Sequence, residues 1–154
     1  FISPEPIEIV VDNLKFCITE KSLRVHAFVI MPSHIHLIVS DGDFDNDRLQ
    51  KTLTEFRKFT GRKLADYIDR TLPVSLSTIT RNAASNDRSR QVWQPGWHAE
   101  GLASEHFLVQ KANYIHENPV RKGFVRSAED WVHSSACYWM NGESAEIPIA
   151  PIVI

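Results

Sequence analysis

The chain has few cysteines, little net charge and no long apolar run. Its two cysteines, Cys17 and Cys137, lie far apart and form no C-x-x-C pair, so we interpret them as reduced thiols of a cytoplasmic protein. Lys and Arg number 17 against 19 Asp and Glu, a net charge of −2, which does not indicate a nucleic-acid partner but leaves room for a local basic patch. No apolar run approaches the roughly 18 residues that a membrane span needs, and no signal peptide is visible. We therefore expect no membrane partner.

The length and the apolar content are those of one folded domain. The 154 residues, 43% of them hydrophobic, can bury a core without metals or disulfides, so we predict a single domain over residues 1–154. Residues 71–90 are polar and have no clear period, which predicts a long mobile loop. Residues 140–154 form a C-terminal tail, whose apolar end, with two prolines, is expected to pack as an extended segment.

Hydrophobic periodicity and turn residues predict a series of helices and strands. Ser3 and Ser104 are expected to cap two of the helices, and an aspartate of "DGDFDND" to cap a third. The predicted elements are a helix over residues 3–22, a hairpin of strands over 23–31 and 35–40, a long helix over 48–70, a short strand within 91–101, a helix over 104–119 and a short helix within 130–144.

The order of these elements predicts an α+β fold. The predicted order is helix, strand, strand, helix, strand, helix. If one strand is added in front, this order becomes βαββαβ, the ferredoxin-like split βαβ layout. We predict an antiparallel sheet of this kind with helices on one face. Because the chain begins at Phe1, in mid-pattern, we expect that the first strand is missing from it.

Two histidines stand one residue apart in the apolar stretch "VIMPSHIHLIVS", residues 29–40. In a strand, residues i and i+2 face the same side, so His34 and His36 project in parallel. Two neutral imidazoles so placed can hold one divalent metal, provided that a third protein ligand and open positions exist. The alternative, two half-exposed strand histidines without a role, stays open on spacing alone.

The helix within "KANYIHENPVRKGFV" offers a third ligand. Tyr114 and Asn118 are four residues apart and so share one helix face, where Asn118 supplies an oxygen suited to Mg²⁺ or Mn²⁺ and Tyr114 a phenol. Glu117 is the fallback ligand, and His116 points to a different face. The alternative makes Tyr114 an amphipathic core residue and Asn118 a helix-ending residue before proline.

Basic residues gather in two places that predict contacts with DNA. Arg121 and Lys122 directly follow the tyrosine helix and are expected to hold phosphates. The long helix carries a basic stripe, consisting of Arg57, Lys58, Arg62 and Lys63. A solvated charged face would give the same pattern as this stripe. Trp93 and Trp97 are candidates for stacking on unpaired bases, although Trp93 fits the core equally well.

Taken together, the segments resemble a known family. "HAFVIMPSHIHLIV" resembles the histidine–hydrophobe–histidine (HUH) motif of the small tyrosine transposases of the insertion sequence 200/605 type. "YIHENPVRKGFV" resembles the signature of one branch, the REP-associated tyrosine transposases, and "FRKFTGRKL", "VWQPGWH" and "DWVHSSACY" look like the same branch. The resemblance runs from Pro6 to Tyr138, nearly the whole chain.

The resemblance implies a ferredoxin-like bacterial enzyme that cuts single-stranded DNA near a hairpin. It implies that Tyr114 is the nucleophile, that His34 and His36 are ligands of a divalent metal, Mg²⁺ or Mn²⁺, and that Asn118 is the third ligand, where the family often has Gln. Attack by the tyrosine would leave a 5′-phosphotyrosine and a free 3′-hydroxyl, so the strand can be rejoined. The implied partner is single-stranded or hairpin DNA, and the protein is a monomer or a homodimer.

Two other functions are compatible with the same residues. The chain could be a domesticated, non-catalytic protein that keeps the fold and binds hairpin DNA. It could also be a metal-dependent hydrolase that uses water, in which Tyr114 is structural. The product of the reaction separates these hypotheses, because only the transposase forms a covalent bond between protein and DNA.

Overall fold

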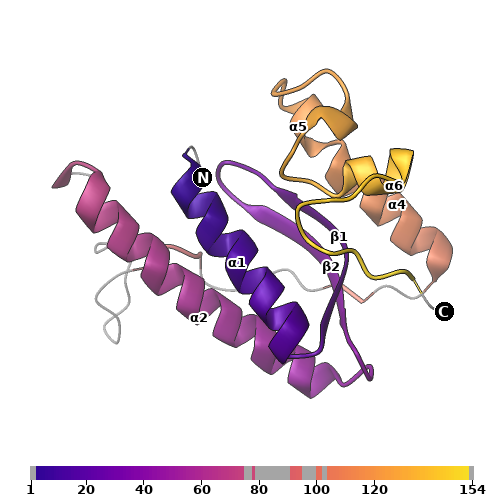
Figure 1. Cartoon of the computed structure of the whole chain (residues 1–154), viewed down its shortest axis with the longest axis horizontal. Helices are drawn as coiled ribbons and strands as arrows, with labels where there is room; N and C mark the ends of the chain where they lie inside the picture. Colours follow the sequence, from indigo (N-terminus) through magenta and orange to yellow (C-terminus); the bar gives the residue numbers. More distant parts are fainter. Residues whose placement is uncertain (1–2, 75–77, 79–90, 95–99, 102–103, 153–154) are drawn as a thin grey trace.

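The computed structural model describes residues 3–74, 78, 91–94, 100–101 and 104–152. Figure 1 shows a two-stranded hairpin with helices on both of its sides. Among the described residues, none of the helices combines the length and the apolar character that a bilayer crossing demands.

The main elements fall close to the positions that the sequence predicts. Glu117 interrupts the predicted helix over residues 104–119, which becomes two helices. The described elements are α1 (Pro4–Glu20), β1 (Leu23–Ile30), β2 (Ile35–Asp41), α2 (Asn46–Thr71), α4 (Glu105–His116), α5 (Asn118–Arg121), a 3₁₀ turn (Ala128–Asp130) and α6 (Ala136–Asn141).

Helix caps agree with the prediction at two of three sites. The Ser104 hydroxyl accepts a hydrogen bond from the amide of Phe107 at 3.2 Å, and the Asp45 carboxylate caps α2 in the same way at 3.0 Å. The predicted cap at Ser3 is wrong, since its hydroxyl makes no cap hydrogen bond. It lies 2.7 Å from the Tyr67 hydroxyl instead, and so ties the start of α1 to α2.

Strand β1 is buried on both faces and forms the centre of the molecule. It pairs with β2 in antiparallel register, with Val29 opposite His36 and an irregularity between Val25 and Ala27. Side chains alternate along a strand, so successive residues of β1 enter two different hydrophobic clusters. The apolar run of β1 therefore reflects packing on two sides.

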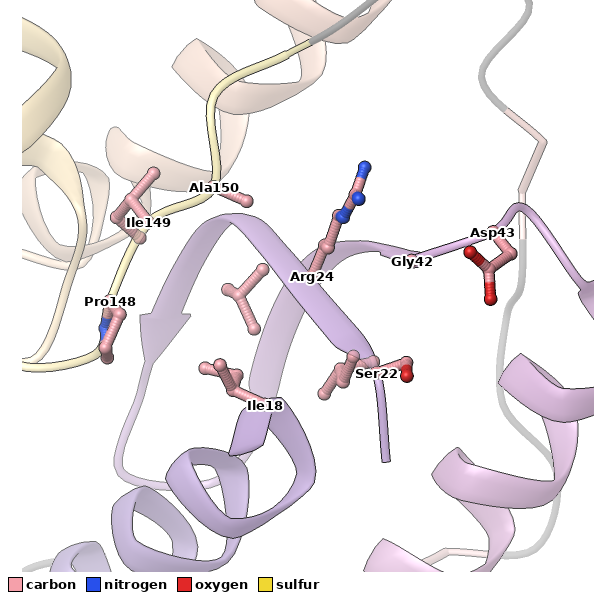
Figure 2. Close-up of a pocket in the computed structure, with 10 residues that line it drawn as sticks. Ile18, Ser22, Arg24, Gly42, Asp43, Pro148, Ile149 and Ala150 are labelled. Atoms are coloured by element: carbon pink, nitrogen blue, oxygen red, sulfur yellow. The ribbon is translucent and has the colours of Figure 1, made fainter. Parts of the chain in front are cut away.

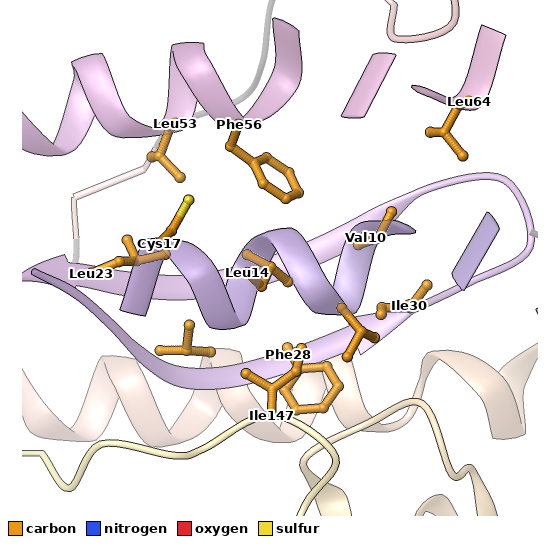
Figure 3. Close-up of a cluster of buried hydrophobic side chains, with 12 residues drawn as sticks. Val10, Leu14, Cys17, Leu23, Phe28, Ile30, Leu53, Phe56, Leu64 and Ile147 are labelled. Atoms are coloured by element: carbon orange, nitrogen blue, oxygen red, sulfur yellow. The ribbon is translucent and has the colours of Figure 1, made fainter. Parts of the chain in front are cut away.

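The two clusters place helices on opposite faces of the hairpin. One lies between the hairpin, α1 and α2, and Figure 3 shows Leu14 and Phe56 pointing into it. The other joins Ala112 and Ile115 of α4 to Val29 and its neighbours on β1. The α+β class is confirmed. The prediction of helices on one face is wrong, because α4 covers the face opposite to α1 and α2, and the ferredoxin-like strand order stays a prediction.

The outer edge of β1 is covered by a segment near the C-terminus. The Ile30 amide donates to the carbonyl of His133 at 2.8 Å, and the Ser135 amide donates to the carbonyl of Phe28 at 3.0 Å. The short helix predicted within residues 130–144 is confirmed as α6, which begins only after this segment. Hydrogen bonding to the strand edge outweighs the local helical pattern here.

The C-terminal tail continues along the same edge. The Ala150 amide donates to the carbonyl of Val25 at 2.8 Å. The His26 ring lies between the Ala150 carbonyl, 3.1 Å from its Nδ1, and the Ser40 hydroxyl, 2.9 Å from its Nε2. Ile147 is fully buried in the cluster beneath α1. The tail is thus part of the core.

The predictions for residues 71–101 are tested only at a few positions. The predicted loop over 71–90 lies outside the described residues except at 71–74 and 78, where the Thr78 hydroxyl donates to the Val74 carbonyl one helical turn away at 2.8 Å. The predicted strand within 91–101 is wrong for residues 91–94, which form no strand. Its remainder lies largely outside the described residues.

Trp93 packs against α2 and belongs to the core. Its indole N–H donates to the Thr60 hydroxyl at 3.0 Å, and a Cβ added at Gly61 would lie 3.1 Å from the indole ring. The glycine in the middle of the long helix therefore makes room for this ring. The core interpretation of Trp93 is confirmed, and Trp97 lies outside the described residues.

The Ser135 hydroxyl connects α4 to β1 inside the protein. It accepts a hydrogen bond from the amide of Phe28 at 2.9 Å and lies 2.8 Å from Nε2 of the fully buried His116. Its own proton can go to the Phe28 carbonyl at 3.3 Å, so the imidazole donates from Nε2 and leaves Nδ1 as an unpaired acceptor among the described residues. Burial lowers the pKa of His116 to about 4, which keeps the ring neutral at pH 7.

We predict that Ser135→Ala lowers the free energy of unfolding by about 2–3 kcal/mol, because two buried donors lose their acceptor. Urea denaturation followed by circular dichroism measures this. The exposed Ser144 supplies the control, and Ser144→Ala should change stability little. Equal midpoints for the two variants would contradict the role of the Ser135 hydroxyl.

We also predict that His116→Gln flattens the pH dependence of stability. The folded pKa of about 4 lies below the ordinary value of 6.5, so the unfolded chain binds the proton first and the wild type loses stability as the pH falls. Between pH 7.5 and 4.5 this single group accounts for about 2–3 kcal/mol. Denaturation curves across this range should show that loss in the wild type and in His106→Ala, a change at an exposed histidine. A His116→Gln profile parallel to the wild type would refute the assignment.

Candidate functional site

The two histidines lie on the face of the hairpin that α4 covers. His34 ends the turn before β2, where its carbonyl accepts the Met31 amide at 2.8 Å, and His36 follows on the strand. Their rings are 4.9 Å apart between centroids and stand at 83° to one another. Ile38, the next residue with the same orientation, is buried in the cluster with α4. The parallel projection predicted from the sequence is therefore present.

Burial and nearby cations keep both imidazoles neutral. The pKa of His34 is lowered by burial and then by the charge of Lys122. The pKa of His36 is lowered by burial, then by His34 and by Arg121. Nδ1 of His34 lies 2.9 Å from the Ser33 hydroxyl, whereas no hydrogen bond to a described residue engages the ring nitrogens of His36. Neutral imidazole is the form that binds metals.

Tyr114 stands in the last turn of α4 with 57% of its surface exposed. The alternative that makes it a core residue is therefore wrong. Asn118 opens α5, and its side-chain amide donates to the carbonyls of Tyr114 at 3.4 Å and Ile115 at 3.1 Å. The helix break at Glu117 thus keeps Asn118 one turn beyond the tyrosine, as the spacing predicts. His116 points into the core, away from this surface.

Arg121 holds the tyrosine and the asparagine together. Its guanidinium carbon lies 4.5 Å from the centre of the Tyr114 ring, a cation–π contact. Its Nη2 donates to the Tyr114 carbonyl at 2.6 Å and to Asn118 Oδ1 at 3.1 Å. The same charge is close enough to lower the pKa of His36. One side chain therefore contacts both the tyrosine and the asparagine, on the helices that cover the histidine face of the hairpin.

The donor set fits a divalent metal in part. His34 and His36 offer two neutral nitrogens on one surface. Within the described ranges, no cluster of three or more His, Cys, Asp or Glu side chains could hold a metal, and this includes the fallback ligand Glu117. The amide oxygen of Asn118 is the remaining candidate, and it accepts from Arg121 here. Asn118 would have to exchange that bond to become a ligand.

The structure separates the two predicted groups of basic residues. Arg121 and Lys122 end α5, which follows α4, the helix that covers the histidine face of the hairpin. The stripe on α2 lies across the hairpin from α4 (Figure 1). Arg57 is occupied there, since it donates to the Gln94 carbonyl at 2.5 Å. The other three residues of the stripe are exposed, namely Lys58, Arg62 and Lys63.

A pocket of ≈ 400 Å³ lies elsewhere, between the ends of the strands and the C-terminal tail. Figure 2 shows Arg24, Asp43 and Pro148 around it. Arg24 pairs with Ser40 near the open end of the hairpin, far along the strands from the histidines. None of the predicted site residues lines this pocket.

The sequence argument missed two features beside the site. It assigned Arg121 to phosphates and did not foresee its contact with the Tyr114 ring, although a spacing of seven residues is two helical turns. It also passed over Phe124 and Trp131, whose rings stack at 5.5 Å. The two residues are seven apart in a segment whose only helical element is a 3₁₀ turn, so helical periodicity could not have shown the contact.

Comparisons with known proteins find two curated relatives that carry the same name. The chain is 27% identical over 109 residues to a Haemophilus influenzae protein named provisionally as a REP-associated tyrosine transposase, covering 71% of this chain and 56% of that protein. It is 22% identical over 119 residues to an Escherichia coli K12 protein named REP-associated tyrosine transposase, covering 75% and 56%.

The matches cover only part of the curated relatives, since the chain spans about half the length of each. No protein-family model matches the chain, and no solved structure matches it. Over most of its length, the chain is thus similar to proteins that carry the name REP-associated tyrosine transposase.

Proposed function

We propose that this chain acts in DNA transposition, cutting and rejoining single-stranded DNA beside hairpin repeats with Tyr114 as the nucleophile. The observation that carries the proposal is that the histidine pair lies on the hairpin face covered by α4, at whose end Arg121 contacts the exposed Tyr114 and Asn118. The names of the curated relatives support the same conclusion.

The chemistry begins at the exposed phenol. Tyr114 Oη attacks the scissile phosphorus and loses its proton, the bond from phosphorus to the 3′ oxygen breaks, and that oxygen takes up a proton. The products are a 5′-phosphotyrosine and a free 3′-hydroxyl. Attack by a 3′-hydroxyl on the phosphotyrosine reverses the step and rejoins DNA, so no external energy source is needed. An exposed tyrosine suits this reaction because the substrate is a polymer that must reach it from outside.

The histidine pair is proposed to hold Mg²⁺ or Mn²⁺, with Asn118 as the third ligand. When bound, such an ion withdraws charge from the phosphate and orients it. The protein's part is to present two imidazoles that are already neutral. Arg121 then has two tasks, since it holds the Asn118 oxygen in the free protein and can turn to a phosphate once that oxygen is engaged.

The phosphates on either side of the cut are proposed to lie against Arg121 and Lys122. Both are exposed and flank the histidines. We further propose that Lys58, Arg62 and Lys63 contact DNA that extends to the other face of the hairpin, because α2 lies on that face. Arg57 joins them only if it releases the Gln94 carbonyl.

Hairpin binding without cleavage is the second candidate function. The hydrogen bond from Arg121 to Asn118 Oδ1 favours it, since a permanent bond there would leave two ligands for the metal. In that case the protein would bind DNA and never become attached to it. The two experiments below separate these functions.

We predict that Tyr114→Phe forms no covalent adduct with DNA, because the attacking oxygen is gone. The assay is a denaturing gel of protein with a labelled single-stranded hairpin DNA, in Mn²⁺ and in chelator. The wild type should give a metal-dependent, protease-sensitive band. Tyr138→Phe, which alters another exposed tyrosine, should retain it. An adduct of full yield in Tyr114→Phe would remove this residue from the role of nucleophile.

We predict that His34→Ala and His36→Ala each weaken binding of Mn²⁺ by at least about tenfold, since each removes a direct ligand. Calorimetric titration with the metal alone measures this without DNA. Both pKa values lie below the ordinary 6.5, so the wild-type affinity should hold as the pH falls to 6.5 and drop in more acidic solution. His106→Ala is the control. Affinity unchanged in both histidine variants would place the metal elsewhere.

A further inference from the structure

Two aromatic side chains form an exposed stack beside the site. The rings of Phe124 and Trp131 lie 5.5 Å apart between centroids and are inclined by 24°. Phe124 keeps 49% of its surface exposed, so one face rests on the indole and much of the rest is open to solvent. We call this pair the aromatic platform. His133 meets the indole edge-on at 6.1 Å.

The aromatic platform is held in place by the backbone. The Trp131 indole N–H donates to the Ile30 carbonyl at 3.0 Å. The Phe124 amide donates to the Pro119 carbonyl at 2.9 Å, and Gly123 just before it has φ +72°, a conformation that favours glycine. The turn after α5 therefore presents Phe124 in a fixed position, and a ligand need not order it on binding.

The aromatic platform lies next to the proposed reaction centre. Ile30, whose carbonyl accepts the Trp131 indole N–H, pairs with Ile35, the residue between the two histidines. The Phe124 amide is bonded to the carbonyl of Pro119, the residue directly after Asn118. Both rings are thus tied to residues that adjoin the proposed metal ligands, and we expect a DNA strand bound there to reach the stack.

The charges around the aromatic platform indicate what it binds. Lys122 and Arg126 are exposed on the Phe124 side, whereas Glu129 and Asp130 are exposed just before Trp131. A site of mixed charge does not select phosphates. An open aromatic face with cations on one side suits a nucleobase whose sugar-phosphate chain follows the cations.

We propose that the aromatic platform stacks an unpaired base of the single-stranded DNA that flanks the cut. The proposal deepens the function proposed above and rests on it for the identity of the DNA. It assigns to Phe124 and Trp131 the stacking role that the sequence suggested for Trp93, which is a core residue. Phe124 acts as a positioning residue, because it would fix the strand relative to Tyr114 without touching the reacting phosphate.

The test compares Phe124→Ala with Phe124→Tyr and Phe16→Ala. Phe16 is 50% exposed on α1, close to the exposure of Phe124, and lies away from the site. The probes are fluorescent DNA hairpins with single-stranded flanks of A, C or T, together with versions that carry one abasic site at successive flank positions. Fluorescence anisotropy gives the dissociation constants, and thermal unfolding confirms that each variant is folded.

Loss of one stacked base should weaken binding by roughly 5- to 150-fold in Phe124→Ala. Phe124→Tyr and Phe16→Ala should stay within about twofold of the wild type, since the ring is kept or lies elsewhere. One abasic position should weaken the wild type equally and leave Phe124→Ala unchanged, because both changes remove the same contact. The proposal would be overturned if Phe124→Ala bound every hairpin with wild-type affinity. It would also be overturned if, at every abasic position, the loss in binding free energy were the same in Phe124→Ala as in the wild type.

The adduct assay with the same hairpins separates this inference from the proposed function. Base-specific coupling to Phe124 in a wild type that forms no adduct would support the aromatic platform and refute cleavage. An adduct in the wild type without coupling to Phe124 would support cleavage and refute the aromatic platform. A wild type that binds none of the hairpins would overturn both.

Discussion

The Ser135 hydroxyl fixes the distance between the tyrosine helix and the hairpin. It contacts the Phe28 amide on β1 and the His116 ring on α4, and Tyr114 lies only two residues before that histidine. Each partner is buried, so breaking this hydrogen bond would leave a buried polar group unpaired. The free-energy cost would be larger than that of losing a surface contact. The proposed nucleophile and the proposed metal ligands stand on different elements, and this buried hydrogen bond sets how those elements meet.

On the surface, Arg121 connects the tyrosine to Asn118. Its flat, delocalised cation lies over the phenol ring while its N–H groups reach a backbone carbonyl and the Asn118 amide oxygen. A lysine has one compact charge and no plane, so it could not make these contacts at once. In the free protein Arg121 and the Asn118 oxygen are therefore already hydrogen-bonded. Metal and DNA must compete with these internal hydrogen bonds to enter the site.

Local patterns predicted the hairpin, the principal helices and the parallel projection of His34 and His36, because each depends on neighbours within one or two turns. The α+β class followed from their order. What failed depends on contacts distant in sequence. The edge pairing of residues 133–135, the second helical layer and the partner of Ser3 are set by tertiary packing. The ligand role of Asn118 stays a prediction, and the sequence argument did not weigh it against the hydrogen bond that Asn118 Oδ1 accepts from Arg121, three residues on.

The C-terminal tail has a consequence for the solution behaviour of the protein. Residues 133–135 and Ala150 take up backbone groups along the outer edge of β1, and Ile147 closes the apolar cluster beneath it. A strand edge left open is a template for pairing with another chain. These residues therefore cover the edge, and a chain shortened before residue 133 is expected to expose an apolar, unpaired strand and to self-associate.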